Sequence, residues 1–215
     1  IINIMISIVN NFEKIKKLIN NNVNIIAVSK SFQYEHIKPL VDYGHKHFGE
    51  NKVQEALSKW SKIREKKSDL LLHMIGKLQS NKAKEAVNLF DYIHSLDNIK
   101  LASLLSKFEN SLKKKRKYFI QVNIGREKQK SGILTEQLDS FYNFCTKELN
   151  LNIIGLMTIP PNDGNVKTYF KGLMELNYSL GLQEISMGMS SDFIEAVKYK
   201  ATFVRIGTAI FGNRN

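Results

Sequence analysis

The sequence predicts an α/β fold, namely a single (β/α)8 barrel of the TIM type with one extra helix at its N-terminal end. About eight short, largely β-branched apolar runs alternate with segments of helical spacing along the chain. These runs are apolar on both faces, which is typical of parallel strands covered by helices. The chain has 215 residues and no linker divides it, so we assign residues 1–215 to one barrel domain.

The first half of the chain supplies the extra helix and four strands. Residues 4–20 have an amphipathic pattern that ends at a run of three asparagines, and the first strand, residues 24–30, follows it and ends on a lysine. The alternation then continues with a helix at 34–43, a strand at 45–51, a helix at 52–64, a strand at 69–76, a polar loop at 77–82 that enters a helix, and a strand at 90–95.

The second half supplies the other four strands. The predicted elements are a helix at 98–114, a strand at 118–124, a polar loop at 125–132, a helix at 135–148, a strand at 151–159, a helix at 165–179, a strand at 184–186, a helix at 193–199 and a strand at 202–206. Two polar residues are in position to act as helix N-caps. They are Asn51, before the helix at 52–64, and Thr135, at the start of the helix at 135–148.

The composition is that of a globular protein with a basic surface. Hydrophobic residues make up 43% of the chain, and the formal net charge is +12 at pH 7. Only Lys113–Lys117 forms a basic run, which we interpret as a solvated helix end. Because no aromatic residue lies in that run and the other lysines are dispersed among acidic residues, we expect no specific nucleic-acid binding.

Three further observations favour a cytoplasmic protein. Cys145 is the only cysteine, so no internal disulfide can form, and its aromatic neighbours favour a buried, inert thiol. No apolar run reaches the roughly 18 residues that a membrane-spanning helix needs, so we expect no membrane partner. The first residues, 1–6, lack the basic region of a signal peptide.

His45 and His47 stand two apart at the start of the second predicted strand. Such a pair shares one face of a strand and can bind a metal. Both residues lie at the closed end of the predicted barrel, and no further His or Cys is near them in the sequence. We therefore expect no metal site.

Lys30 is the first residue that suggests chemistry. It ends the first strand, and ligands of parallel α/β folds bind at the carboxyl ends of the strands. An amine held in an apolar site loses its proton more easily and can then attack a carbonyl to form a Schiff base. The alternative is a strand-end lysine that is turned out to water.

The exits of the last two strands are built alike. Gly188 stands near Ser190, and Gly207 is followed by Thr208. Glycine lets backbone N–H groups approach an anion, and hydroxyl groups add donors. Barrels often bind phosphate at these two loops, so we predict a phosphate site, although glycines that only make tight turns would give the same pattern.

Arg205 lies one residue before the end of the eighth strand, so its side chain is predicted to point into the barrel mouth. A buried arginine needs a partner, which is either a carboxylate or the ring nitrogen of a bound cofactor. An amine, a phosphate site and a partner for a ring nitrogen together match the aldehyde, phosphate and pyridine nitrogen of pyridoxal 5′-phosphate (PLP).

Several motifs resemble one known family, the pyridoxal phosphate homeostasis proteins, also called the YggS/PROSC family. The resemblance covers nearly the whole chain, in order. The motifs are Ala27-Val28-Ser29-Lys30, Phe48-Gly49-Glu50-Asn51 with Val53-Gln54-Glu55, His73-x-Ile75-Gly76-x-Leu78-Gln79-x-Asn81-Lys82, Lys130-Ser131-Gly132, Gly155-Leu156-Met157, Ser186-Met187-Gly188-Met189-Ser190 and Val204 to Gly212. The family pattern usually has an acidic residue after the Met-Ser pair, where this chain has Ser191 followed by Asp192.

The resemblance implies a barrel like the N-terminal domain of alanine racemase and a set of cofactor-binding residues. It implies that PLP forms an internal aldimine on Lys30 and that Asn51 lies beside the cofactor. Arg205 would face the pyridine nitrogen. The phosphate would be held by Ser190, Gly207 and Thr208.

The function implied is PLP binding and intracellular vitamin B6 homeostasis without substantial catalysis. The alternative is a fold-type III amino-acid racemase or related PLP enzyme. Racemases use a second domain to bring a tyrosine to the cofactor, whereas here only three residues follow Gly212, and Tyr34, Tyr43 and Tyr199 fall in helices outside the predicted barrel. We therefore expect no paired proton donors and no enzyme activity. The expected partners are PLP and PLP-dependent apoenzymes, and the expected state is a monomer or weak dimer.

Overall fold

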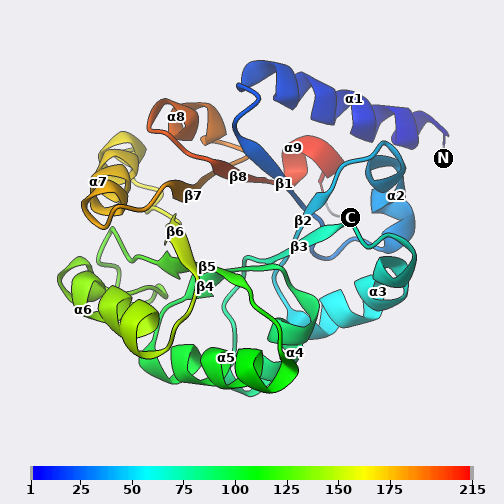
Figure 1. Ribbon diagram of the computed structural model, residues 1–215. Coiled ribbons are helices and arrows are strands. Elements are labelled where there is room, and N and C mark those ends of the chain that lie inside the picture. The colour runs from blue at the N-terminus through cyan, green and yellow to red at the C-terminus, as the bar shows by residue number, and fades with distance from the viewer. Residues whose placement is uncertain (1, 214–215) are drawn as a thin grey trace.

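A computed structural model describes the backbone of residues 2–213 and the side chains of residues 7–213. Eight parallel strands close into a barrel in chain order, with the last strand pairing with the first, so the predicted (β/α)8 fold is confirmed (Figure 1). The strands are β1 (Asn24–Val28), β2 (His47–Glu50), β3 (Leu71–Met74), β4 (Tyr92–Leu96), β5 (Lys117–Gln121), β6 (Ile153–Met157), β7 (Glu184–Met189) and β8 (Phe203–Ile206).

Helices surround the barrel, and the extra N-terminal helix is present. The α-helices are α1 (Ile2–Leu18), α2 (Tyr34–Asp42), α3 (Val53–Lys66), α4 (Ala83–Leu89), α5 (Ile99–Leu112), α6 (Leu138–Asn143), α7 (Val166–Ser179), α8 (Phe193–Lys198) and α9 (Thr208–Phe211). The first of them, α1, lies against α2 and α9 (Figure 1). Its buried residues are spaced by three or four positions, as in an amphipathic helix. They are Ile8, Phe12 and Ile15, and the buried Ile19 continues the spacing just after the helix ends.

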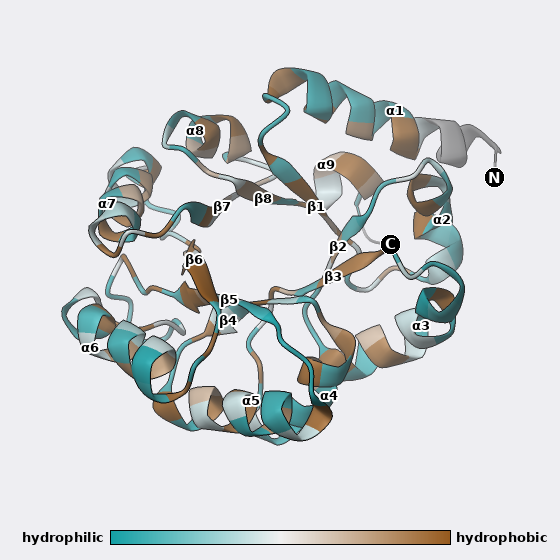
Figure 2. Cartoon of the chain, in the orientation of Figure 1, coloured by the Kyte–Doolittle hydropathy of each residue, from teal (hydrophilic) through white to brown (hydrophobic). Residues whose placement is uncertain are grey.

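The core has two parts because alternate residues of each strand point to opposite faces of the sheet. One apolar cluster lies in the barrel interior and includes Ile26, Phe119, Met157 and Phe203. A much larger cluster lies between the strands and the helices. The outer helices carry hydrophilic and hydrophobic residues along their length, as expected for helices with one buried face (Figure 2). Since Phe203 points inward, Arg205, two residues later on β8, also points into the barrel.

Three local predictions were wrong. β7 continues to Met189 rather than ending at Ser186, with a register shift against β8 at this point. Gly188 therefore lies within the strand, where its φ of +91° suits glycine and an added Cβ would lie 2.6 Å from that of Ala196. The two predicted helix caps also differ, because Lys52 and Leu134 occupy the N-cap positions instead of Asn51 and Thr135.

The helix predicted at 135–148 is continuous but not uniform. A 3-10 turn over Thr135–Gln137 leads into α6, and a π-helical turn over Phe144–Glu148 follows. Cys145 lies in that last turn and is buried, as predicted. Burial raises the pKa of its thiol to about 12, which makes it unreactive at neutral pH.

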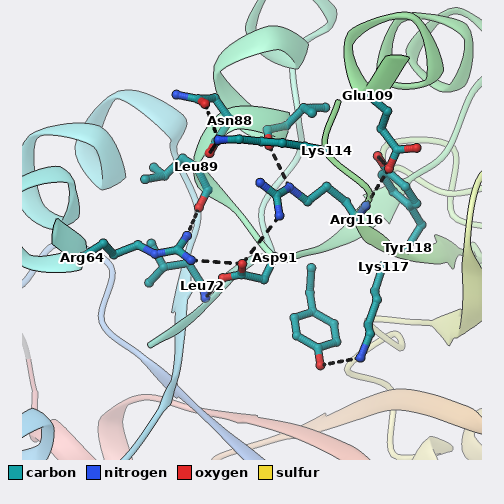
Figure 3. A network of polar contacts seen from close by, with 12 residues as sticks. Arg64, Leu72, Asn88, Leu89, Asp91, Glu109, Lys114, Arg116, Lys117 and Tyr118 are labelled. Carbon is teal, nitrogen blue, oxygen red and sulfur yellow. Dashed lines mark hydrogen bonds and ion pairs between the residues drawn. The ribbon is translucent and has the colours of Figure 1, made fainter. Parts of the chain in front are cut away.

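The basic run begins at a helix end, as predicted, since Lys113 is the C-cap of α5, and Lys113, Lys115 and Lys117 are exposed. Lys114 and Arg116 are half-buried, which was not predicted. The structure ends α5 at Leu112 and uses the run to cap the carboxyl end of α4, where backbone carbonyls lack helical partners (Figure 3). The contacts from the run are Arg116 Nε to the Val87 oxygen at 2.8 Å and Lys114 Nζ to the Asn88 oxygen at 3.2 Å. Arg64, from α3, donates to the Leu89 oxygen. Asp91 lies between the two arginines, 3.1 Å from Arg64 Nη2 and 3.8 Å from Arg116 Nη1.

Candidate functional site

The six predicted site residues lie at the carboxyl ends of four strands that are neighbours in the closed barrel, in the order β7, β8, β1 and β2. Lys30 follows β1 and Asn51 follows β2. Ser190 follows β7, Arg205 lies in β8, and Gly207 and Thr208 follow it. Barrel closure therefore brings residues from both ends of the sequence to one side of the mouth.

Ser190 lies against the start of α9, where the sequence predicts an anion site. The Ser190 hydroxyl oxygen accepts hydrogen bonds from the backbone N–H groups of Gly207, at 3.3 Å, and Ala209, at 3.4 Å. The serine oxygen thus marks a point at which backbone donors converge, next to the exposed Thr208. Backbone N–H groups with adjacent hydroxyls are the donor set that suits a phosphate group.

The loop after β7 is held by Asp192 despite the change at Ser191. The Met189 N–H donates to Asp192 Oδ1 at 2.6 Å, so this carboxylate accepts a hydrogen bond from the residue three positions before it. Asp192 occupies the N-cap position of α8, but its side chain makes no capping hydrogen bond to that helix. Its charge favours the protonated form of Arg205.

Arg205 is a buried cation held by neutral acceptors. Only 4% of its surface is exposed. Its Nη1 donates to the Ser186 hydroxyl and its Nη2 to the Thr158 carbonyl, both at 2.8 Å. Among the residues that the structure describes, no carboxylate lies within 4.0 Å of its guanidinium, so the salt-bridge alternative does not hold there.

The charge and spare donors of Arg205 suit an acceptor in the barrel mouth. Burial lowers its pKa to about 10, which still leaves the guanidinium protonated at neutral pH. A guanidinium has five N–H donors, of which described residues accept two. The remaining donors could meet a neutral ring nitrogen, so this residue fits the cofactor that the sequence suggests.

Lys30 is half-buried in a loop whose neighbouring residues are fixed by β2 and α3. The Ser29 hydroxyl donates to Glu50 Oε1 at 2.7 Å, and Lys59 Nζ donates to the Ser29 carbonyl at 2.7 Å. On the other side, the Ser31 N–H donates to Glu55 Oε1, and Ser31 has a φ of 67°. The backbone before and after Lys30 therefore has a defined course.

This supporting cluster contains residues that sequence reasoning missed. Lys59 pairs with Glu50 at 2.8 Å, and their side chains are only 6% and 0% exposed. Trp60 Nε1 also donates to Glu50 Oε1, at 2.9 Å. Two features of the sequence could have indicated this cluster. Glu50 and Glu55 both belong to the family motif that follows the second strand, and Lys59 stands four residues after Glu55, the spacing of an ion pair on a helix.

Asn51 lies apart from the other predicted site residues. It lines a cavity of about 440 Å³ between the exits of β2 and β3, together with Gly76, Gln79 and Lys82. Neither Lys30 nor Arg205 lines that cavity. The structure thus places Asn51 at the correct end of the barrel but in a neighbouring depression.

The two histidines considered as metal ligands do not form a pair. His45 precedes β2, and its Nε2 contacts the backbone oxygen of His47 at 2.9 Å. The His47 ring instead contacts His73. In the part of the chain that the structure describes, no group of three or more His, Cys, Asp or Glu residues is arranged to hold a metal ion.

Comparisons with known proteins show the family and the fold. The sequence profile of the family described as "Alanine racemase, N-terminal domain" matches residues 5–215. A protein of Aquifex aeolicus named "Pyridoxal phosphate homeostasis protein" is 38% identical over 205 residues, covering 90% of this chain and 88% of the relative. A protein of Escherichia coli with the same name is 33% identical over 202 residues, covering 90% and 86%.

Solved structures of other proteins have the same fold as this chain. PipY of Synechococcus elongatus without PLP has a TM-score of 0.90 and 34% identity, covering 95% of this chain and all of PipY, and its PLP-bound structure has a TM-score of 0.88. An alanine racemase of Clostridium difficile has a TM-score of 0.77 at 16% identity, with 97% of this chain and 57% of the racemase covered, which shows a shared fold alone. Within the described residues, no helix is long and apolar enough to cross a membrane.

Proposed function

We propose that this chain, which belongs to the alanine racemase N-terminal domain family and is similar to the pyridoxal phosphate homeostasis proteins, binds PLP and takes part in vitamin B6 homeostasis. The observation that carries the proposal is Arg205, a buried cation with neutral partners and spare donors at the barrel mouth. Arg205 lies on β8, which pairs with β1, the strand before Lys30, on one side and with β7, the strand before Ser190, on the other.

Each proposed residue has one role. The Lys30 amine would be the covalent attachment point for the cofactor aldehyde. Ser190, Gly207 and Thr208 would donate hydrogen bonds to the phosphate. Arg205 would donate to the pyridine nitrogen, and Asn51, which lines the neighbouring depression, would border the cofactor from the β2 side.

We propose that the protein holds and releases the cofactor without substantial catalysis. When bound, PLP supplies an electrophilic aldehyde and an electron-withdrawing ring. Arg205, whose guanidinium is protonated at neutral pH, disfavours a proton on the ring nitrogen and so weakens that electron withdrawal. Racemases of this fold can tolerate such a cation, so a second feature is needed to separate the two functions.

That feature is the placement of the tyrosines considered as proton donors. Tyr34 begins α2 and packs edge-on against Trp60, at a centroid distance of 6.3 Å. Tyr43 and Tyr199 follow the last residues of α2 and α8. All three are on the outer helical layer, whereas inversion at a substrate carbon needs acid–base groups on two faces of the cofactor.

The test is incubation of the PLP-loaded protein with each common L-amino acid in deuterated water, followed by proton NMR. The proposal expects a visible absorption band from bound PLP and α-deuteration no faster than with free PLP. Rapid α-deuteration with racemisation, lost in Lys30→Ala, would instead establish the racemase alternative. We further propose a cytoplasmic location, PLP-dependent apoenzymes as recipients, and a monomer or weak dimer. Size-exclusion chromatography with light scattering tests the last point.

A further inference from the structure

A chain of hydrogen bonds crosses the barrel interior from Arg205 to the amino end of β2. Arg205 Nη1 donates to Ser186 Oγ at 2.8 Å, and Ser186 Oγ lies 2.9 Å from His94 Nδ1. His94 Nε2 lies 2.9 Å from His73 Nδ1, and His73 Nε2 lies 3.0 Å from His47 Nδ1. Five strands each contribute one residue, and all of these residues except the partly exposed His47 are buried.

Arg205 sets the favoured direction of the hydrogen bonds in the chain, because only one direction leaves the Ser186 hydroxyl hydrogen with an acceptor. A guanidinium can only donate, so Ser186 Oγ accepts from it. Within the described structure, His94 Nδ1 is the acceptor left for the serine hydroxyl hydrogen. His94 must then carry its hydrogen on Nε2 and donate to His73, which in the same way donates to His47. All three rings are therefore assigned as neutral Nε2–H tautomers.

Burial and neighbouring charges keep these rings neutral. Burial lowers the pKa of His73 and His94 well below the ordinary value, and the positive charge of Arg205 adds to the effect on His94. For His47, burial and the charges of Lys117 and Lys46 lower the pKa to about 4, against a smaller opposite effect of Asp91. Neutrality matters because a protonated His94 would have no lone pair on Nδ1 to accept the Ser186 hydrogen.

Aromatic packing fixes the ring planes. His94 is stacked on Phe119, with centroids 4.3 Å apart and planes 18° apart. His73 is stacked on Tyr92 in the same way, at 4.3 Å and 12°. Rotation of either ring out of its plane would break both stacking and hydrogen bonding, and a half-turn within the plane would break the hydrogen bonds, so the chain has one favoured arrangement.

We propose that His94, supported by His73 and His47, is a positioning residue for the cofactor site: it orients the Ser186 hydroxyl so that Ser186 accepts from Arg205. The guanidinium is thereby held toward the barrel mouth by a neutral partner, and its positive charge is available to the ring of a bound cofactor. The proposal rests on the proposed function for the identity of that ring, but the hydrogen-bond chain itself belongs to the protein alone.

The chain can be tested without cofactor by nitrogen-15 NMR of the histidine side chains in the full, PLP-free protein at pH 7. The expected result is that His47, His73 and His94 are all neutral, with hydrogen on Nε2. A hydrogen on Nδ1 of His73 or His94, or a charged ring at either residue, would overturn the proposal. Failure of the wild type to bind PLP would refute the proposed function and leave this measurement unaffected.

The effect on the site is tested with two substitutions of His94. His94→Phe keeps the ring stacked on Phe119 but removes the acceptor, whereas the amide oxygen of His94→Asn can replace Nδ1 as acceptor. We expect His94→Phe to raise the PLP dissociation constant about tenfold, roughly one hydrogen bond to a charged group, and to shift the pH midpoint of the visible band. With His94→Asn, the PLP dissociation constant and the pH midpoint of the visible band should both return most of the way to the wild-type values.

Ser95→Ala is the matched control, because Ser95 is the next residue of β4, is buried and makes no side-chain hydrogen bond among the described residues. It should change neither readout. If His94→Phe lowers only the unfolding midpoint and leaves affinity and pH midpoint at wild-type values, the role is structural and the proposal is wrong. If His94→Phe does not fold, His73→Phe is used instead, which removes the acceptor for His94 Nε2. The same changes in PLP affinity and pH midpoint then support or refute the proposal.

Discussion

The Lys59 ammonium lies 2.7 Å from the carbonyl oxygen of Ser29, the residue immediately before Lys30. Lys59 is almost fully buried and is paired with Glu50, which is completely buried. A buried ion pair must offset a large desolvation cost, so its value often lies in fixing one geometry. Here the geometry that it fixes is the backbone that carries Lys30.

Replacing Lys59 should therefore damage both stability and the site. In Lys59→Met, the Glu50 carboxylate is left buried without its cation, which costs about 3–5 kcal/mol of unfolding free energy. We expect weaker PLP binding as well, because the Ser29 carbonyl loses its donor. Urea denaturation and a PLP titration measure the two effects.

Two comparisons make the Lys59 prediction specific. Lys62→Met, on the exposed face of α3, should leave both quantities near wild type. Lys59→Met combined with Glu50→Gln should regain part of the lost stability, since it removes the uncompensated charge. A destabilisation by Lys62→Met equal to that by Lys59→Met would contradict the assigned role of the buried pair.

The anion site predicts a strong preference for the phosphorylated vitamer. Hydrogen bonds to a charged group contribute about 1.5–3 kcal/mol each, so PLP should bind orders of magnitude more tightly than pyridoxal. Ser190→Ala should weaken PLP binding about tenfold or more and leave pyridoxal binding nearly unchanged. Fluorescence titration with both vitamers checks this, with the exposed Ser191→Ala as control. Equal affinities for the two vitamers would show that these N–H groups do not bind phosphate.

Stability should fall as the pH decreases from about 6.5 to about 4. Burial lowers the pKa values of His45 and His47 to about 4, and it lowers those of His73 and His94 as well. Below pH 6.5 the unfolded chain gains protons that the folded protein does not, so each histidine removes about 1.4 kcal/mol of unfolding free energy per pH unit in that window. Above pH 6.5 their contribution is fully present.

Urea denaturation at a series of pH values measures this slope. His45→Gln should lower this slope by the contribution of about one proton taken up on unfolding. His45 can be replaced alone because it lies outside the hydrogen-bond chain. A stability that does not change between pH 7 and pH 5 would contradict the burial of neutral histidines.

The sequence was sufficient for the fold and for the end of the barrel that carries the site. Strand periodicity predicted the inward direction of Arg205, and the common direction of parallel strands places Lys30, Ser190 and Gly207 at one end. The bounds of β7 were wrong because a glycine that looks like a turn residue lies in a strand irregularity. The contacts of Lys114 and Arg116 within the basic run were not predicted because their partners, the carbonyls of α4, are about 30 residues away in the chain.

The supporting residues could not be predicted for a similar reason. Lys59 has the spacing of an exposed helical lysine, and its buried partner Glu50 is on another element. His73 and His94 each stand alone in an apolar run, and the contact between His94 and Ser186 spans 92 positions. Only barrel closure brings these residues together, and local patterns carry no information on contacts of that range.

The central claim, that Lys30 carries the cofactor in a site built by β7, β8, β1 and β2, is tested most directly by chemical trapping. The PLP-loaded protein is reduced with borohydride, digested and mapped by mass spectrometry. The account predicts the pyridoxyl group on Lys30 and loss of the visible band in Lys30→Ala. A pyridoxyl group found instead on Lys77 or Lys82, in the neighbouring cavity beside Asn51, would contradict it.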